Sequence, residues 1–155
     1  MSKFYADSML GKLSRFLRFL GHDTLYRIDE DIESMLKNAL DNNRIILTQA
    51  RKVLQLSNRK GVKSVMMPTT NIIDQLQVLK QELNLVMQIP PKKMRCSICN
   101  GDLLDRNKNE IADKIPKGTF EYYDTFWECK ECGKIFWLGS HWEDIKRTIA
   151  EVEKR

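Results

Sequence analysis

Four cysteines carry the clearest chemistry in this sequence. They form two Cys-x-x-Cys pairs, Cys96 with Cys99 and Cys129 with Cys132. In a reducing compartment such pairs bind a metal more often than they form disulfides. Four thiolates complete a tetrahedron around Zn²⁺ and leave no open coordination position, so the spacing predicts a structural zinc. Four free buried thiols or a redox pair are the alternative interpretations.

Glycines follow both cysteine pairs at positions that suit a metal-binding turn. Gly101 comes two residues after Cys99, and Gly133 comes directly after Cys132. Because glycine has no Cβ, it accepts the positive φ angles that tight turns need. Both glycines are therefore expected to shape the turns that aim the sulfur atoms at one point.

Acidic side chains follow two of the predicted strands. Asp7 comes directly after the first strand, and Asp29, Glu30 and Asp31 follow the second. The carboxyl ends of parallel strands meet at one edge of a sheet, where ligands bind. Carboxylates brought together there hold Mg²⁺ or Mn²⁺, which activates water and stabilises the charge on a phosphodiester. An acid at the start of a helix also caps that helix, and for Asp7 the two interpretations are equally compatible with the sequence.

Polar and basic residues accompany this acidic edge. Thr48 ends the third predicted strand, and its hydroxyl suits a carboxylate or a phosphate, although a threonine there is usually a simple cap. Five basic residues are candidates for binding phosphates: Lys12, Arg15, Arg18, Arg51 and Lys52. The first three recur on one face of a predicted helix, opposite its leucines. For any one of them alone, a solvated basic face is the simpler interpretation.

These side chains are positioned by alternating strand-like and helix-like segments. Strands are predicted at 4–6, 23–26, 44–48 and 62–67, and helices at 9–20, 31–40, 50–60 and 72–83. This alternation with short loops predicts the α/β class, in which β-α units build a mostly parallel sheet covered by helices.

A proline- and lysine-rich segment at 88–93 predicts a linker. It divides the chain into a domain at 1–90 and a C-terminal unit at 91–155. The C-terminal unit holds the cysteines, a strand predicted at 135–138 and a helix predicted at 141–154. Few apolar residues lie before that strand, so we expect the zinc to supply much of the stability of the unit.

Composition sets the outer limits of the interpretation. The chain has 155 residues, of which 42% are hydrophobic and 30% charged, with 7 Gly and 4 Pro, which excludes collagen, a coiled coil and a long disordered tail. No run of 18 apolar residues and no signal-peptide pattern occurs, so we expect a cytoplasmic protein that does not span a membrane. The net charge of +5 suits a polyanionic partner such as nucleic acid.

Several motifs resemble the Mut7-C ribonuclease domain family. Residues 4–18 are similar to the opening motif of that family, and Gly21-His22-Asp23 and Arg44-Ile45-Ile46-Leu47-Thr48 follow as the family has them. The C-terminal part also fits, with Tyr123-Asp124-x-Phe126-Trp127 before the second cysteine pair and Gly139-Ser140-His141-Trp142 after it. The resemblance covers nearly the whole chain. It implies a PIN-like three-layer α/β/α core fused to a small zinc ribbon.

The resemblance also implies a function and its residues. PIN-like nucleases gather carboxylates around Mg²⁺ or Mn²⁺ to hydrolyse RNA phosphodiesters. By position, Asp7 matches the first family acid and Asp31 the second, with Asp29 as the alternative if the alignment shifts. Thr48 precedes the third acidic position, where this chain has Ala50 in place of the family aspartate.

A methyl group cannot bind a hard cation, so Ala50 predicts weak binding of the catalytic metal. Natural loss of catalysis, a deliberate inactivating substitution, and rescue by another carboxylate such as Asp29 or Asp74 all account for it. The family-like residues around position 50 favour the substitution.

The resemblance further implies an RNA partner with some structure, and PIN-like proteins often form homodimers. In that interpretation Lys12, Arg15, Arg18 and Arg51 hold the RNA backbone. The alternative is a non-catalytic module that binds RNA or a protein partner, and a third, weaker hypothesis is a DNA-binding ribbon protein.

The aromatic residues of the C-terminal unit have two interpretations. Trp127, Trp137 and Trp142, with Phe126 and Phe136, are expected to form the core of the ribbon and its docking surface. Base stacking by one exposed ring is the less favoured alternative. His141 is expected to be a packed structural residue, with a nucleic-acid contact as the alternative.

Overall fold

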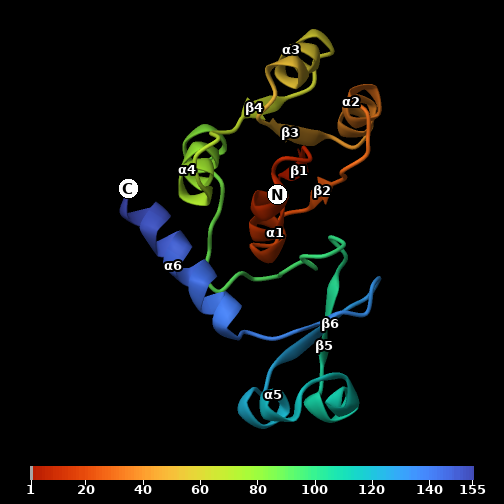
Figure 1. Ribbon diagram of the computed structural model, residues 1–155, viewed down its shortest axis with the longest axis vertical. Coiled ribbons are helices and arrows are strands. Elements are labelled where there is room, and N and C mark those ends of the chain that lie inside the picture. The colour runs from red at the N-terminus through yellow and green to blue at the C-terminus, as the bar shows by residue number, and fades with distance from the viewer. Residues whose placement is uncertain (1) are drawn as a thin grey trace.

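A four-stranded parallel sheet forms the centre of the computed structural model, which describes residues 2–155 (Figure 1). Its strands are β1 (Lys3–Ala6), β2 (Thr24–Tyr26), β3 (Arg44–Thr48) and β4 (Ser64–Met66), in the order β2-β1-β3-β4. The chain first moves from β1 to β2 and then returns past β1 to β3. The connections therefore reverse direction between β1 and β3, and the crevice at the carboxyl ends of these two strands is where such sheets bind ligands.

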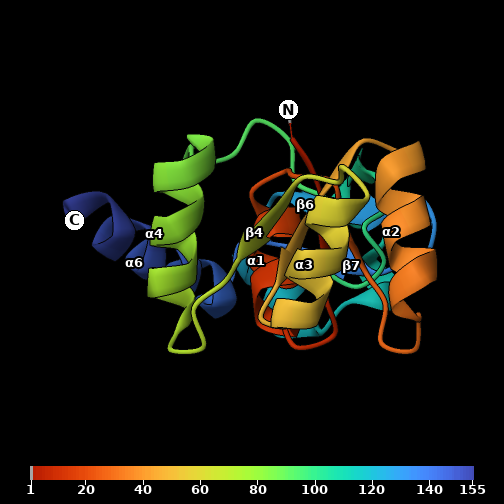
Figure 2. The ribbon, with the colours of Figure 1, turned by 90° about the horizontal axis from the view of Figure 1, so that it is seen from above.

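Helices cover both faces of the sheet, which confirms the predicted α/β class (Figure 2). They are α1 (Gly11–Phe19), α2 (Ile32–Asp41), α3 (Arg51–Arg59) and α4 (Ile72–Leu83). On one face, α1 and α4 pack against Phe4 and Ala6. On the other face, α2 and α3 pack against Tyr5 and Ile46. Side chains alternate between the two faces of a strand, so β1 has to be apolar along its buried length.

The C-terminal helix α6 (Ser140–Lys154) packs against α4. Its buried residues recur at helical spacing and join the same apolar core as Phe4 and Leu10; they are Trp142, Ile145, Ile149 and Val152. Gln77 Nε2 also donates to the Val152 carbonyl at 2.7 Å. The C-terminal helix thus covers the N-terminal core, although the sequence groups it with the ribbon. The division of the chain at 90/91 remains a prediction.

The ribbon is a small antiparallel sheet of β5 (Leu103–Arg106), β6 (Phe126–Cys129) and β7 (Ile135–Phe136). Between β5 and β6 lie two short 3₁₀ turns, Lys108–Glu110 and Ala112–Lys114, and the helix α5 (Lys117–Tyr122). The buried apolar residues of this part are few: Ile111, Ile115 and Phe126. The sequence does not predict β5, α5 or β6, because charged residues interrupt their apolar positions.

The longest helix, α6, has 15 residues. Among residues 2–155, no helix has the length and apolar character that crossing a bilayer requires.

A buried histidine makes the stability of this fold sensitive to acid. The Nε2 atom of His22 lies 3.0 Å from the Val86 carbonyl, and its ring meets Phe4 edge-on at 5.9 Å. Its Nδ1 atom is buried and has no partner among the described residues. Burial lowers the pKa of His22, although the hydrogen bond to Val86 opposes this change.

The stability of the protein is therefore expected to fall as the pH drops below about 6.5, the pKa of an unfolded histidine. There the unfolded chain takes up a proton that the folded chain does not bind, which lowers the free energy of unfolding by up to about 1.4 kcal/mol per pH unit. Urea unfolding between pH 7.5 and 5.5 measures this loss. His22→Gln is expected to reduce it, whereas His141→Gln is the control because that side chain is exposed. Equal acid sensitivity in His22→Gln would contradict the assignment.

Candidate active site at the carboxyl edge of the sheet

Asp7 is buried at the carboxyl end of β1, next to the end of the neighbouring strand β3. Its side chain is 6% exposed, and its backbone N–H donates to the Leu47 carbonyl at 3.0 Å. Three donors orient the carboxylate. Oδ2 accepts from the Thr48 hydroxyl at 2.5 Å and from the Gln49 N–H at 3.4 Å, and Oδ1 accepts from the Met9 N–H at 2.9 Å. Asp7 is not the N-cap of α1, because that position belongs to Leu10.

Thr48 connects Asp7 to the start of α3. Its side chain is fully buried, and its hydroxyl donates to Asp7 while accepting the Ala50 N–H at 3.0 Å. The hydroxyl is thus used to hold a carboxylate, one of the two roles that its position suggests. Any part that Thr48 has in binding substrate remains a prediction.

Ala50 occupies the N-cap position of α3 and is exposed. Its backbone is extended, with φ −99° and ψ 119°, and no side chain caps the helix there. Aspartate and asparagine are preferred at an N-cap because their side chains accept the free N–H groups of the first turn. An aspartate at position 50, which the family resemblance implies, would both cap α3 and lie two residues from the threonine that holds Asp7.

The second acidic segment follows β2, and its three acids differ in environment. Asp31 is the exposed N-cap of α2, and its two oxygens accept the Ser34 N–H at 2.8 Å and the Ser34 hydroxyl at 3.1 Å. These hydrogen bonds lower the pKa of Asp31. Asp29 is exposed to solvent.

Glu30 is the acid of this segment that turns inward. Its carboxylate accepts the hydroxyl of Tyr5 from β1 and lies 3.2 Å from Arg27. Burial, followed by the charge of Asp31, raises the pKa of Glu30. The sequence singled out Asp29 and Asp31, and the tyrosine in the preceding strand gave no sign that its hydroxyl would reach Glu30.

These acids do not form a complete site for a divalent metal. Within residues 2–155, the only group of three or more acidic, histidine or cysteine ligand atoms that lie close together is the cysteine cluster. Asp74 accepts a hydrogen bond from the Thr70 hydroxyl and lies 3.5 Å from Arg155, and its role as a replacement ligand remains a prediction. The site has an oriented Asp7 and lacks the partners that Mg²⁺ or Mn²⁺ needs. The roles of Asp7, Asp29 and Asp31 as metal ligands remain predictions.

Arg18 is not part of an exposed basic ridge, which corrects the sequence prediction. Lys12, Arg15, Arg51 and Lys52 are exposed, but Arg18 is only 5% exposed. Its guanidinium donates to the carbonyls of Thr24, Ser97 and Ile98 at 2.9, 3.0 and 3.3 Å. Arg18 follows Ser14 by four residues and shares a buried face with it, a spacing that could have indicated burial.

The four cysteines form a cluster that fits Zn²⁺. All four sulfur atoms lie within 4.8 Å of one another, with Cys96 and Cys132 3.6 Å apart and Cys99 and Cys129 3.4 Å apart. Zn–S bonds of about 2.3 Å in a tetrahedron place the sulfur atoms about 3.8 Å apart, close to these distances.

The local environment shifts the pKa values of Cys129 and Cys96 in opposite directions. Burial raises the pKa of Cys129, but N–H groups of Cys132 and Glu131, each 3.4 Å from its sulfur, help to bring it down to about 7. Burial raises the pKa of Cys96 to about 12.

The two metal-binding turns differ in how they use glycine. Gly133 has a φ of +77°, as expected. In the first turn the positive φ, +70°, belongs to Asn100 instead. Gly101 is needed for another reason, because a Cβ there would lie 3.0 Å from the Cys129 sulfur and 3.2 Å from the Cys99 sulfur.

Asn100 and Arg18 fasten the first metal-binding turn to the core. The side-chain oxygen of Asn100 accepts the Thr24 N–H at 3.0 Å, and its amide donates to Asp23 at 2.7 Å. Asp23 also pairs with Arg44 at 2.8 Å. Burial raises the pKa of Asp23, but the hydrogen bonds from Arg44 and Asn100 outweigh this effect and lower it. The cysteine cluster is thus tied to β2, the strand that precedes the second acidic segment.

His141 and Trp142 have separate environments. Trp142 is buried in the main core and packs on Phe19, with 4.8 Å between ring centroids. Trp142 thus packs on the N-terminal core, as expected of the docking surface, and is not part of the apolar cluster of the ribbon. His141 is exposed, which contradicts the expectation of a packed residue. Phe126 and Trp137 do pack together in the ribbon, at 6.2 Å.

Comparison with known proteins assigns the family. The Mut7-C RNAse domain matches residues 2–149, nearly the whole chain. No curated protein and no solved structure is matched. The chain belongs to the Mut7-C RNAse domain family.

Proposed function

We propose that this chain is an RNA-cleaving domain whose hydrolytic site is built around Asp7 and impaired at Ala50. The family supplies RNA as the substrate class. The observation that carries the proposal is the contact chain from the Asp7 carboxylate through the Thr48 hydroxyl to the Ala50 N–H. It joins Asp7, the one buried acidic residue among residues 2–155, to position 50, where the family resemblance implies an aspartate.

The chemistry assigned to this site is endonucleolytic hydrolysis of a phosphodiester. Asp7 is oriented by three donors, so its carboxylate has a fixed direction before any substrate binds. An aspartate at position 50 would add a hard oxygen ligand at the same edge, where Mg²⁺ or Mn²⁺ activates water and offsets the charge on the phosphate. Arg51 is exposed directly after Ala50 and is assigned to the phosphate backbone.

The decisive test is to restore the acid. Ala50→Asp is expected to raise the rate of RNA hydrolysis in Mg²⁺ or Mn²⁺ at least about tenfold, which corresponds to about 1.4 kcal/mol of barrier. Cleavage of a labelled RNA oligonucleotide, followed on a denaturing gel, measures the rate. Adding Asp7→Asn to the restored variant is expected to remove the gain.

Ala50→Asn is the matched control for this experiment. Both side chains cap α3 and are expected to stabilise the protein by about 1 kcal/mol, but only the aspartate supplies an anionic ligand. A gain in hydrolysis shared by both variants would show that helix capping, and not the added carboxylate, caused it.

A non-catalytic binding module is the second candidate, favoured by the incomplete set of acids around Asp7 among residues 2–155. It predicts that Ala50→Asp folds and binds RNA but cleaves none. It also predicts that RNA binding by the unmodified chain is unaffected by removal of Mg²⁺.

A further inference from the structure

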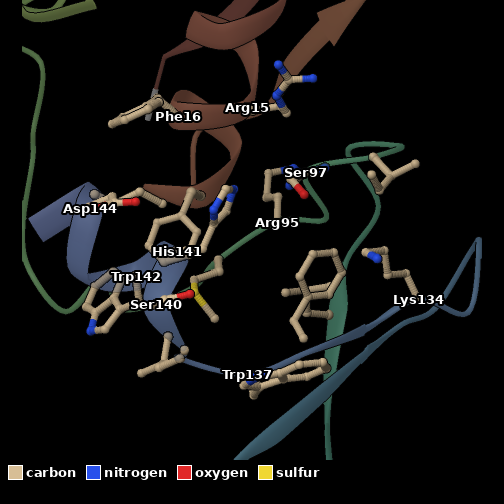
Figure 3. A pocket seen from close by; sticks show the side chains of 18 of the residues that line it. Arg15, Phe16, Arg95, Ser97, Lys134, Trp137, Ser140, His141, Trp142 and Asp144 are labelled. Atoms are coloured by element: carbon tan, nitrogen blue, oxygen red, sulfur yellow. The ribbon is translucent and has the colours of Figure 1, made fainter. Parts of the chain in front are cut away.

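A cleft of about 980 Å³ lies between α1 and the ribbon, and Asp7 is not among the residues that line it. One wall is the exposed side of α1, the opposite wall is the segment around β7, and the first turn of α6 lies between them. Figure 3 shows Arg15 and Phe16 on one side, Lys134 and Trp137 on the other, and His141 between them. The cleft is therefore formed jointly by the core and the ribbon.

The cations of this cleft are available to a ligand. Lys12, Arg15 and Lys134 are exposed and form no ion pair with any residue in the range 2–155. The one acidic residue in the lining is Asp144, which pairs with Arg147 at 2.7 Å. An excess of unpaired positive charge in a concave site attracts anions.

Aromatic rings lie among these cations. Phe16 comes from α1, and Phe136 and Trp137 come from the ribbon; all three are partly exposed. Lys134 Nζ lies 5.9 Å from the centroid of the Phe136 ring.

Trp137 is held firmly in place. It packs on Phe126 on one side, and the backbone of Gly139 approaches so closely that a Cβ there would lie 3.1 Å from the indole Nε1. A fixed ring beside unpaired cations is the combination by which proteins bind single-stranded nucleic acid, since bases stack on the rings and phosphates meet the cations.

The cleft leads towards the proposed hydrolytic site. Its wall α1 begins at Gly11, four residues after Asp7, and Lys12 lies in the first turn of this helix. A strand lying along α1 in the direction from Phe19 to Lys12 thus approaches the end of the sheet where Asp7 is located.

We propose that this cleft binds a single-stranded segment of RNA, with its phosphates on Lys12, Arg15 and Lys134 and a base stacked on Trp137. The inference rests on the proposed function in taking RNA as the ligand. A single strand is favoured over a duplex because the faces of paired bases are stacked and cannot meet the rings.

Fluorescence anisotropy of the full chain with a labelled single-stranded oligouridylate tests the charges. The double variant Arg15→Gln/Lys134→Gln is expected to weaken binding about tenfold. It is also expected to reduce the slope of log K against log salt by about 1.4, since each lost phosphate contact removes about 0.7. The matched control Arg59→Gln/Lys63→Gln removes two exposed cations, one at the last residue of α3 and one directly before β4, and should change neither value. Equal effects of the two double variants would overturn the proposal.

The role of the Trp137 ring is tested by comparing a variant that removes the aromatic ring with one that keeps it. Trp137→Leu is expected to weaken binding about fivefold or more, and Trp137→Phe to retain most of it, because stacking needs an aromatic face. Circular dichroism establishes that each variant is folded. Binding that is as tight to duplex RNA, or to an acidic peptide, as to the single strand would overturn the assignment of this ligand.

The two proposals fail in different ways. If the cleft variants bind RNA normally while Ala50→Asp cleaves it, the cleft assignment is wrong and the proposed function stands. If Ala50→Asp is inactive while the cleft variants lose binding, the hydrolytic site is wrong and the cleft stands.

Discussion

Removal of zinc is expected to unfold the ribbon while the four-stranded sheet persists. The ribbon buries only three apolar residues of its own, Ile111, Ile115 and Phe126, which is too small a core for independent stability. Structural zinc contributes about 10–16 kcal/mol in zinc-finger peptides, so the metal would be the largest single source of stability in this part of the chain. The main core, in contrast, joins β1, α1, α4 and α6 and does not depend on the cysteines.

Hydrogen exchange after treatment with a chelator measures this effect. Amides of β5, β6 and β7 are expected to lose protection, amides of β1 and β3 to keep it, and added Zn²⁺ to reverse the change. Cys129→Ser should reproduce the apo behaviour, whereas Lys130→Ala, exposed in the same turn, should not. Full protection of the ribbon in chelated protein would contradict a zinc-stabilised ribbon.

Replacement of Arg18 by methionine is expected to destabilise the protein by about 3–5 kcal/mol, because three carbonyl groups lose their donor at about 1–3 kcal/mol each. The side chain donates to carbonyls on both sides of the junction, Thr24 in the core and Ser97 in the first metal-binding turn. Burial lowers the pKa of Arg18, whereas the neighbouring Cys96 and Cys99 raise it. A four-thiolate zinc centre has a formal charge of −2, so the buried cation also faces a negative site.

Urea unfolding at constant zinc concentration measures the change in the free energy of unfolding. Arg18→Lys keeps the charge but cannot supply the same fork of donors, so an intermediate loss is expected. Arg59→Met, at an exposed position, should change the free energy by no more than about 0.5 kcal/mol. A loss as small in Arg18→Met would show that the junction does not depend on this residue.

The sequence predicts the sheet well because its strands are short apolar runs separated by clear turns. Arg44–Thr48 and Ile72–Leu83 have the predicted bounds, and the other core elements begin and end within a few residues of them. The strands of the ribbon are harder to predict from the sequence. None of the residues of β5 is buried: Leu103 and Arg106 are partly exposed and the two between them are exposed, so no period of two marks it as a strand.

Polar contacts between residues distant in the chain cannot be predicted from the local sequence pattern. A charged residue in a helix is usually solvated, so the local pattern predicts an exposed Arg18; its carbonyl partners at 97 and 98 are distant in the chain. The local pattern likewise assigns the positive φ to the adjacent glycine, the usual residue for that conformation, whereas the structure has it at Asn100. In both cases the hydrogen bonds join the N-terminal core to the first metal-binding turn, so the partner residue is far away in the sequence.

The hydrogen bond from Thr24 to Asn100 bears on how the protein behaves at high concentration. β2 is one of the two outer strands of the sheet, and the Thr24 N–H donates to the Asn100 side chain instead of to a neighbouring strand. Unpaired amides along an outer strand invite a second molecule to add its own strand there, which is a common start of aggregation. The metal-binding turn shields this strand, so the apo protein should be stored dilute, and light scattering should rise on chelation before the sheet itself melts.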